Sequence, residues 1–233
     1  MTEVRFNTAL IVGAGSGLSA SLARVLADEG IKVALAARST EDLAGLAKET
    51  GAVTIACDAS KRADVERLFA AIEGNFGAPE IVIYNASYRA RGPLIDLDPV
   101  EVEKSIAVSA FGGFLVAQQA VKRMLPQKRG AILFTGASAS VKGYAESAPF
   151  AMGKFALRGL AQSMARELHP LGIHVAHVVI DGGIKSERRP EPPGKTATLL
   201  DPDSIAASYL HLIHQPHSAW SWELELRPWV EKF

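Results

Sequence analysis

A short apolar run that ends in closely spaced glycines constrains the fold more than any other part of this sequence. The run Ala9–Val12 leads into three glycines within five residues, and apolar residues then return at helical spacing over 18–23. This pattern predicts a strand, a tight turn and a helix. Glycines let the backbone approach a ligand, and the unpaired N–H groups of a helix N-terminus favour an anion. The candidate phosphate-binding residues are therefore Gly13, Gly15, Ser16, Gly17 and Leu18.

The composition limits the kind of protein that this chain can be. With 233 residues, 48% of them hydrophobic and 21% charged, it is most simply one α/β domain over 1–233. Lys plus Arg and Asp plus Glu are balanced at 25 each, so we expect neither a nucleic acid nor a membrane as a partner. No apolar run approaches the ~20 residues of a membrane span. The single cysteine, Cys57, fits a reducing compartment, and we expect a cytoplasmic location.

Apolar runs of strand length alternate with helical patterns along the whole chain. The expected strands are 9–12, 31–37, 53–57, 81–84, 131–134, 173–180 and 222–226, and the expected helices are 19–29, 40–50, 61–73, 98–125, 147–168 and 203–214. This alternation predicts a doubly wound parallel sheet of about seven strands with helices on both faces. Ligands of such sheets bind beyond the carboxyl ends of the strands. We therefore expect the residues that directly follow strands to converge on one rim, namely Arg38, Asp58, Asn85, Ala137 and Asp181.

Several motifs at these strand ends recur in one known family. They are Gly13-x-x-x-Gly17, Asp58, Asn85-Ala86, Phe150-x-x-x-Lys154 and Gly182-x-Ile184-x-Ser186. Taken together, at these intervals, the chain resembles the short-chain dehydrogenase/reductase family over nearly its whole length. The resemblance implies a Rossmann-type fold, NAD(H) or NADP(H) as cofactor, and hydride transfer to or from a small alcohol or carbonyl substrate. It also implies a homodimer or homotetramer built on the two long helices.

The expected catalytic unit of that family is incomplete here. Its lysine is present as Lys154, but its tyrosine position holds Phe150. Its serine position falls on Ala137, and only a one-residue shift of the loop would bring Ser138 into place. Its asparagine position falls near Ser109. The candidate catalytic positions are therefore Lys154, Ser138 and Phe150, the last as an occupant of the tyrosine position.

The missing phenol changes the expected chemistry, because phenylalanine has no proton to exchange with the substrate oxygen. General acid–base catalysis is typically worth about 10²–10⁴-fold in rate. Three outcomes follow: another group supplies the proton, a water relay on Lys154 supplies it, or the protein does not turn over. Tyr144 is the nearest phenol in sequence, although a surface tyrosine is the favoured interpretation of that residue. We expect an oxidoreductase with an atypical proton donor, with a non-catalytic dinucleotide-binding sensor or partner subunit as the alternative.

Charge at the end of the second expected strand bears on the choice of cofactor. An acidic residue there would bind the ribose 2′-hydroxyl of NAD, whereas this chain has Arg38, whose guanidinium suits a 2′-phosphate. We therefore favour NADP(H) over NAD(H), with a solvated or adenine-stacked arginine as the alternative. Asp58 and Ala59 are expected at the adenine, although Asp58 is equally well explained as a cap before the next helix.

The remaining cofactor contacts are expected from two loops. Asn85 and Ala86 would line the ribose through their backbone, and Gly182, Ile184 and Ser186 would contact the nicotinamide. The segment 181–198 matches the position of the family's substrate lid, with an ordinary mobile surface loop as a nearly equal alternative.

Three histidines near the expected sixth strand raise the question of a metal site. His174 and His177 are expected on opposite faces of that strand, and His169 precedes it without a carboxylate at ligand spacing. We therefore expect no metal.

Overall fold

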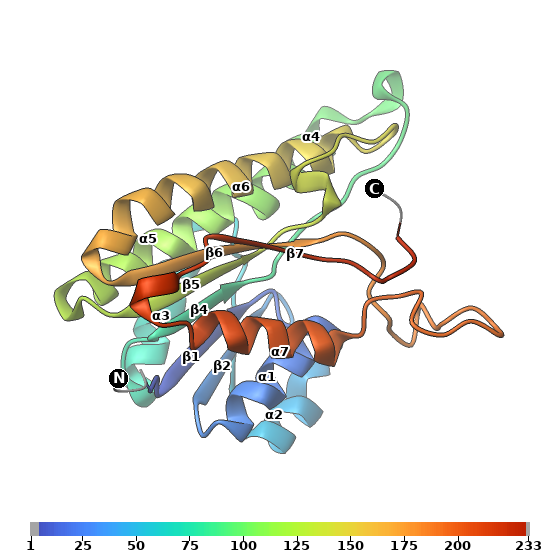
Figure 1. Ribbon diagram of the computed structural model, residues 1–233. Helices are drawn as coiled ribbons and strands as arrows, with labels where there is room; N and C mark the ends of the chain where they lie inside the picture. Colours follow the sequence, from blue (N-terminus) through green and yellow to red (C-terminus); the bar gives the residue numbers. More distant parts are fainter. Residues whose placement is uncertain (1–4, 232–233) are drawn as a thin grey trace.

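The computed structural model describes residues 5–231, and its core is one parallel sheet with helices on both faces (Figure 1). The strand order is β3-β2-β1-β4-β5-β6-β7, and every neighbouring pair is parallel. The order reverses direction between β1 and β4. The predicted doubly wound seven-stranded sheet is confirmed, and its carboxyl edge at that reversal is where a ligand is expected.

The bounds of the elements lie within a few residues of the predicted ones. The strands are β1 Thr8–Val12, β2 Lys32–Ala37, β3 Val53–Ala56, β4 Ile81–Tyr84, β5 Gly130–Thr135, β6 Ile173–Ile180 and β7 Glu223–Leu226. The α-helices are α1 Leu18–Asp28, α2 Ala44–Thr50, α3 Arg62–Phe76, α4 Pro99–Ile106, α5 Gly112–Met124, α6 Ala148–Leu168 and α7 Pro202–Ile213. Short 3₁₀ helices span Glu41–Leu43, Leu94–Asp96, Leu125–Gln127, Ser138–Ser140, His169–Leu171 and His217–Ala219.

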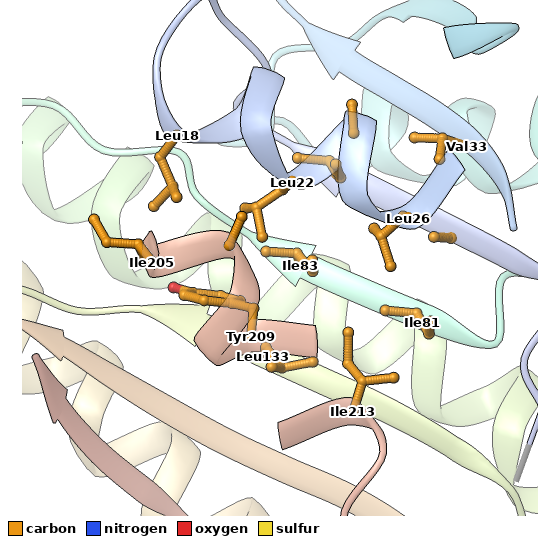
Figure 2. Packing of buried hydrophobic residues seen from close by; sticks show 14 of the residues in the cluster. Leu18, Leu22, Leu26, Val33, Ile81, Ile83, Leu133, Ile205, Tyr209 and Ile213 are labelled. Carbon is orange, nitrogen blue, oxygen red and sulfur yellow. The ribbon is translucent and has the colours of Figure 1, made fainter. Parts of the chain in front are cut away.

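Two hydrophobic cores lie on the two faces of the sheet. Figure 2 shows the first, in which Leu22 of α1 and Tyr209 of α7 pack over Ile83 and Leu133 of the central strands. The second core packs α3, α5 and α6 against the opposite face, around residues such as Phe134. Because alternate strand residues enter opposite cores, the central strands are apolar throughout, as expected of a sheet that is covered on both sides.

The helix predicted over 98–125 contains an irregularity that the sequence pattern did not reveal. It begins at Pro99, with the Asp98 carboxylate accepting from the Val100 N–H, but a π-helical turn at Ala107–Phe111 separates α4 from α5. Inside this turn the Val108 carbonyl accepts a hydrogen bond from the Tyr84 hydroxyl. This contact comes from β4, and helical periodicity carries no information about such a contact.

The helices of the described residues can be compared with the length and hydropathy that a membrane span requires. Among residues 5–231, no helix is both long enough and apolar enough to cross a bilayer.

Candidate active site

The glycine turn lies between β1 and α1 and is shaped by close backbone packing. Gly13 has a φ of +86°, and a Cβ there would lie 2.4 Å from the Ala86 backbone nitrogen, so only glycine fits. A Cβ on Gly15 or Gly17 would meet nothing within 4 Å. Helix α1 begins at Leu18 with neither a side-chain cap nor an acidic residue in its first turn. Such an open, uncapped N-terminus offers its unpaired N–H groups to an anion.

Two side chains tie the glycine turn to the end of β4. The Ser19 hydroxyl donates to the Gly13 carbonyl at 3.0 Å, and Asn85 Nδ2 donates to the Ser19 hydroxyl at 2.7 Å. Ser19 is the second residue of α1. Its buried hydroxyl bonds both to the turn and to the neighbouring strand end, which fixes the shape of the turn.

A first cavity, of about 590 Å³, lies next to the glycine turn at the carboxyl ends of the strands. The predicted residues that line it are Gly13, Arg38, Asp58, Ala59, Asn85 and Ala86. Arg38 forms no ion pair with a carboxylate in the described part of the chain. Its guanidinium is therefore available to an anionic ligand.

Asp58 lines this cavity and also organises the chain before α3. Its carboxylate accepts hydrogen bonds from the Ser60 N–H at 3.1 Å and from the Ser60 hydroxyl at 2.7 Å. Burial acts to raise the pKa of Asp58, but the bonds from Ser60 and the charges of Lys61 and Arg38 hold that pKa below its usual value. Asp58 is therefore a cavity residue that also closes a local turn at Ser60, but it does not cap α3, whose N-cap is Lys61 without a side-chain hydrogen bond.

A second cavity, of about 560 Å³, adjoins the first, since Asn85 and Ser87 line both. The predicted residues that line it are Gly17, Leu18, Asn85, Ala137, Phe150, Lys154, Gly182, Ile184 and Ser186. The glycine turn, the Phe150–Lys154 motif and the segment after β6 therefore meet at one place, as expected from strand ends that share a rim. Gly15 and Ser16 lie in the same turn but line neither cavity.

Lys154 is the titratable group buried in the wall of the second cavity. Its ammonium donates to the Thr135 carbonyl at 2.7 Å, and its side chain is 3% exposed. Burial, together with the nearby charge of Arg89, lowers the pKa of Lys154 from 10.5 to about 8. The pKa of Lys154 therefore lies closer to neutral pH than that of an ordinary lysine.

A cation covers the phenylalanine at the tyrosine position. The guanidinium carbon of Arg89 lies 4.0 Å from the centroid of the Phe150 ring, and the ammonium of Lys154 lies 5.8 Å from the same centroid. Such contacts are attractive because the ring face is electron-rich. The wall around Phe150 thus carries positive charge where the family has a phenol.

The segment after β6 is anchored at both ends of the part that lines the cavity. Asp181 is 3% exposed and pairs with Lys142 and with Arg227, each at 3.2 Å. Farther along, the Glu191 carboxylate accepts from the Thr198 hydroxyl at 2.6 Å. A lid function for 181–198 stays a prediction, but its first residues have a defined conformation against the cavity.

A family comparison agrees with this geometry. The family model described as short chain dehydrogenase matches residues 7–191. The chain belongs to the short-chain dehydrogenase/reductase family. An uncharacterized oxidoreductase of Staphylococcus aureus strain N315 is 27% identical over 98% of this chain and 100% of its own.

Solved structures of the short-chain dehydrogenase/reductase family have the same fold. A short-chain dehydrogenase from Rhodopseudomonas palustris is 34% identical, covers 97% of this chain and 100% of its own, and superposes with a TM-score of 0.82. A metagenomic short-chain oxidoreductase in complex with NADP is 27% identical over 95% of this chain and 97% of its own, with a TM-score of 0.84.

The structure does not bring Ser138 to the site. Ala137 lines the second cavity, whereas Ser138 lines neither cavity and begins the 3₁₀ helix Ser138–Ser140. The one-residue shift that would place this hydroxyl at the serine position of the family is absent, because the Ser138 carbonyl accepts from the N–H groups that close the 3₁₀ turn. Tyr144 also lines neither cavity and is exposed.

A buried polar network behind the cavity holds the loop after β5. The Ser140 hydroxyl accepts from the Ala137 N–H at 3.1 Å and lies 3.3 Å from His177 Nε2, while His177 Nδ1 lies 3.1 Å from the Glu223 carboxylate. This order resembles a hydrolytic triad, but Ser140 and His177 are fully buried, so no substrate reaches them. Burial lowers the pKa of His177 to about 4, which keeps it neutral. The network therefore positions Ala137.

Ser109, at the family's asparagine position, supports a loop and lines neither cavity. Its hydroxyl accepts from the Tyr88 N–H at 3.1 Å, and the Ser105 hydroxyl donates to the Tyr88 carbonyl at 2.9 Å. Both hydroxyls are fully buried. Together they fix the backbone immediately before Arg89.

A further question about the site is whether its side chains are grouped as metal ligands. Over residues 5–231, no three His, Cys, Asp or Glu side chains are grouped so as to bind a metal ion.

Sequence reasoning missed Arg89, Arg188 and Arg189, which line the second cavity. Their position in loops that follow β4 and β6 was the available signal, since ligands of such sheets bind beyond the carboxyl ends of the strands.

Proposed function

We propose that this protein is an NADP(H)-dependent oxidoreductase that interconverts a small alcohol and its carbonyl compound, with Lys154 as the proton donor. The observation that carries the proposal is the buried Lys154 ammonium in the wall of the second cavity, with its pKa lowered to about 8. A general acid works best when its pKa lies near the working pH. Lys154 thus takes the role that the phenol has elsewhere in the family.

The hydrogen bonds of Lys154 leave it able to donate to a substrate. One N–H of its ammonium is held by the Thr135 carbonyl, and within residues 5–231 no further hydrogen bond of this group is recorded, so another N–H would reach the substrate oxygen, directly or through a water molecule. When bound, the nicotinamide supplies the hydride to the carbonyl carbon. Lys154 gives the proton to the oxygen, and the products are the alcohol and the neutral amine.

The two cavities supply the expected cofactor contacts. We assign the phosphates to the turn formed by Gly13, Gly15, Ser16, Gly17 and Leu18, and the nicotinamide end to Gly182, Ile184, Ser186 and Lys154. Asp58 and Ala59 would contact the adenine, and Asn85 and Ala86 the ribose. Arg38 forms no ion pair within the described residues, although its charge acts on Asp58, and it supports NADP(H) over NAD(H) through its match to a 2′-phosphate.

An exposed apolar surface supports self-association. Phe111 of the π turn, Phe114 of α5, and Met152 and Phe155 of α6 are between 41% and 51% exposed. We propose that they take part in a homodimer or homotetramer built on these helices. The cytoplasmic location stays a prediction from the single cysteine.

A second candidate function rests on the residues that are missing. Phe150 and Ala137 bring no hydroxyl to the second cavity, which favours a dinucleotide-binding protein without turnover. The two candidates differ in whether NADPH is consumed.

The test compares NADPH binding with NADPH oxidation. The protein is mixed with NADPH and a panel of aldehydes and ketones, and both quantities are measured for Lys154→Met and for Lys122→Met, a control at an exposed position of α5. Oxidation that Lys154→Met abolishes, with the control unaffected, supports the enzyme. Tight NADPH binding without oxidation of any substrate supports the second candidate.

A further inference from the structure

The second cavity is cationic although the chain as a whole is neutral. Lys plus Arg and Asp plus Glu are both 25 in the sequence. No Asp or Glu lines this cavity, whereas its cationic lining residues are Arg89, Lys154, Lys185, Arg188 and Arg189. Like charges in one concave site repel each other and focus a positive potential. The balanced composition of the chain does not explain why these cations gather at one cavity. Their clustering therefore indicates a function of the cavity.

Within the described residues, the positive charges of the cavity form no ion pairs with carboxylates. Within residues 5–231, the carboxylates that form ion pairs do so with other cations, and Arg89, Arg188 and Arg189 pair with none of them. Lys185 is the exception to this isolation, because its charge acts on Glu191. Burial and the charges of Arg91 and Arg189 lower the pKa of Arg89, as expected for cations held close together. An anion that enters the cavity would relieve this repulsion.

Arg89 is held at the reacting end of the cavity. Its guanidinium lies on the Phe150 ring, and the backbone before it is fixed by the two buried hydroxyls that bond to Tyr88. A positioned guanidinium loses less side-chain freedom on binding than a mobile one. Arg89 therefore lies where it can contact a group beside the substrate carbonyl.

Arg189 is held by a backbone turn on the opposite loop. Its N–H and carbonyl exchange hydrogen bonds of 3.0 Å with those of Ser186. Its guanidinium lies next to Gly183, where a Cβ would come within 2.6 Å of Nη1. Two guanidinium groups from loops far apart in sequence thus line one cavity.

We propose that the substrate carries a carboxylate or phosphate group beside its carbonyl, and that Arg89 and Arg189 bind this group. The proposal rests on the proposed function and names its substrate class. Guanidinium groups bind both anions through paired, charge-assisted hydrogen bonds, and this shared chemistry defines the class. A neutral ketone or aldehyde would leave the guanidinium groups without an anion.

The cofactor's own phosphates are the competing explanation for these cations. Gly17 and Leu18, at the proposed phosphate site, line the same cavity. The glycine turn and the uncapped N-terminus of α1 already offer those phosphates N–H donors, so Arg89 and Arg189 remain for the substrate. NADPH affinity separates the two explanations.

The first experiment compares matched anionic and neutral substrates in NADPH-dependent reduction. The pairs are pyruvate with methyl pyruvate, acetoacetate with methyl acetoacetate, and dihydroxyacetone phosphate with dihydroxyacetone. We expect kcat/KM to be at least about tenfold higher for the anion of at least one pair, and the pair shows which anion is preferred. Arg89→Gln and Arg189→Gln should remove this preference, whereas Arg91→Gln, at a position that lines neither cavity, should retain it.

The second experiment measures binding without turnover. The NADPH-loaded protein is titrated calorimetrically with oxalate and with inorganic phosphate, and NADPH affinity is measured for the same variants. We expect binding of one anion that Arg89→Gln and Arg189→Gln each weaken at least about tenfold, with NADPH affinity changed less than about twofold.

The outcomes separate this proposal from the proposed function. Equal reduction of acids and esters would leave an oxidoreductase and overturn the anionic substrate. Arginine-dependent anion binding without any turnover would support the anion site and overturn the reductase. Loss of NADPH affinity in the arginine variants with an intact preference for anions would assign both arginines to the cofactor. Neither anion binding nor turnover would overturn both proposals.

Discussion

The guanidinium of Arg89 lies 4.0 Å above the ring of Phe150, on the residue that replaces the family's tyrosine. The same arginine lowers the pKa of the neighbouring Lys154 ammonium, after the larger effect of burial. One cation therefore acts on both members of the Phe150–Lys154 motif. The loss of the phenol coincides with a lysine that is easier to deprotonate, which is the change that an alternative proton donor requires.

Restoring the phenol should raise the rate of carbonyl reduction. Phe150→Tyr places a second proton donor beside Lys154, and we expect kcat to rise at least about tenfold, within the range known for general acid–base catalysis. Steady-state kinetics with NADPH measures this. Phe76→Tyr is the matched control, since Phe76 lies at the end of α3 and lines neither cavity. An unchanged kcat in Phe150→Tyr would show that proton supply does not limit the reaction.

Removing the charge of Arg38 should weaken NADPH binding selectively. Arg38→Gln loses the charge-assisted contact to a 2′-phosphate, and we expect NADPH affinity to fall at least about tenfold while NADH affinity changes little. Fluorescence titration with both nucleotides measures the effect. Arg166→Gln, at an exposed position of α6, serves as the control. A wild-type protein that binds NADH more tightly than NADPH would refute the role given to Arg38.

Substitution of two glycines of the same turn by alanine should affect different properties of the protein. Gly13→Ala forces a side chain into a left-handed backbone and against Ala86, so we expect a loss of at least about 2 kcal/mol in the free energy of unfolding. Gly15→Ala meets open space, and we expect stability within about 0.5 kcal/mol of wild type but weaker NADPH binding. Urea unfolding and NADPH titration measure the two effects. Equal stability of both variants would contradict the packing described for Gly13.

The sheet and most of the site followed from sequence because they depend on local patterns. The apolar run before Gly13 marks β1, and the residues just after strands, such as Arg38 and Asn85, necessarily meet at the carboxyl edge of a parallel sheet. Contacts between distant segments are not encoded in this way. The π turn at Ala107–Phe111, for example, accepts a hydrogen bond from the hydroxyl of Tyr84 in β4.

The side chains that shape the second cavity were the least predictable part. Ser138 is turned into a 3₁₀ helix, an outcome that depends on hydrogen bonds within the loop. Arg89 reaches Phe150 because buried hydroxyls on α4 and the π turn fix its loop. The sequence showed that arginines are present in these loops, but only the folded chain shows that they line one cavity.

The pH dependence of carbonyl reduction tests the central claim, that Lys154 donates the proton. The reaction needs the protonated amine, so kcat/KM for reduction should fall as pH rises through about 8, and the rate of alcohol oxidation should rise over the same range. Arg89→Gln removes a positive charge near Lys154 and should move the falling limb to higher pH. A reduction rate that does not fall near pH 8 in the wild type, or a limb that stays in place in Arg89→Gln, would contradict the account.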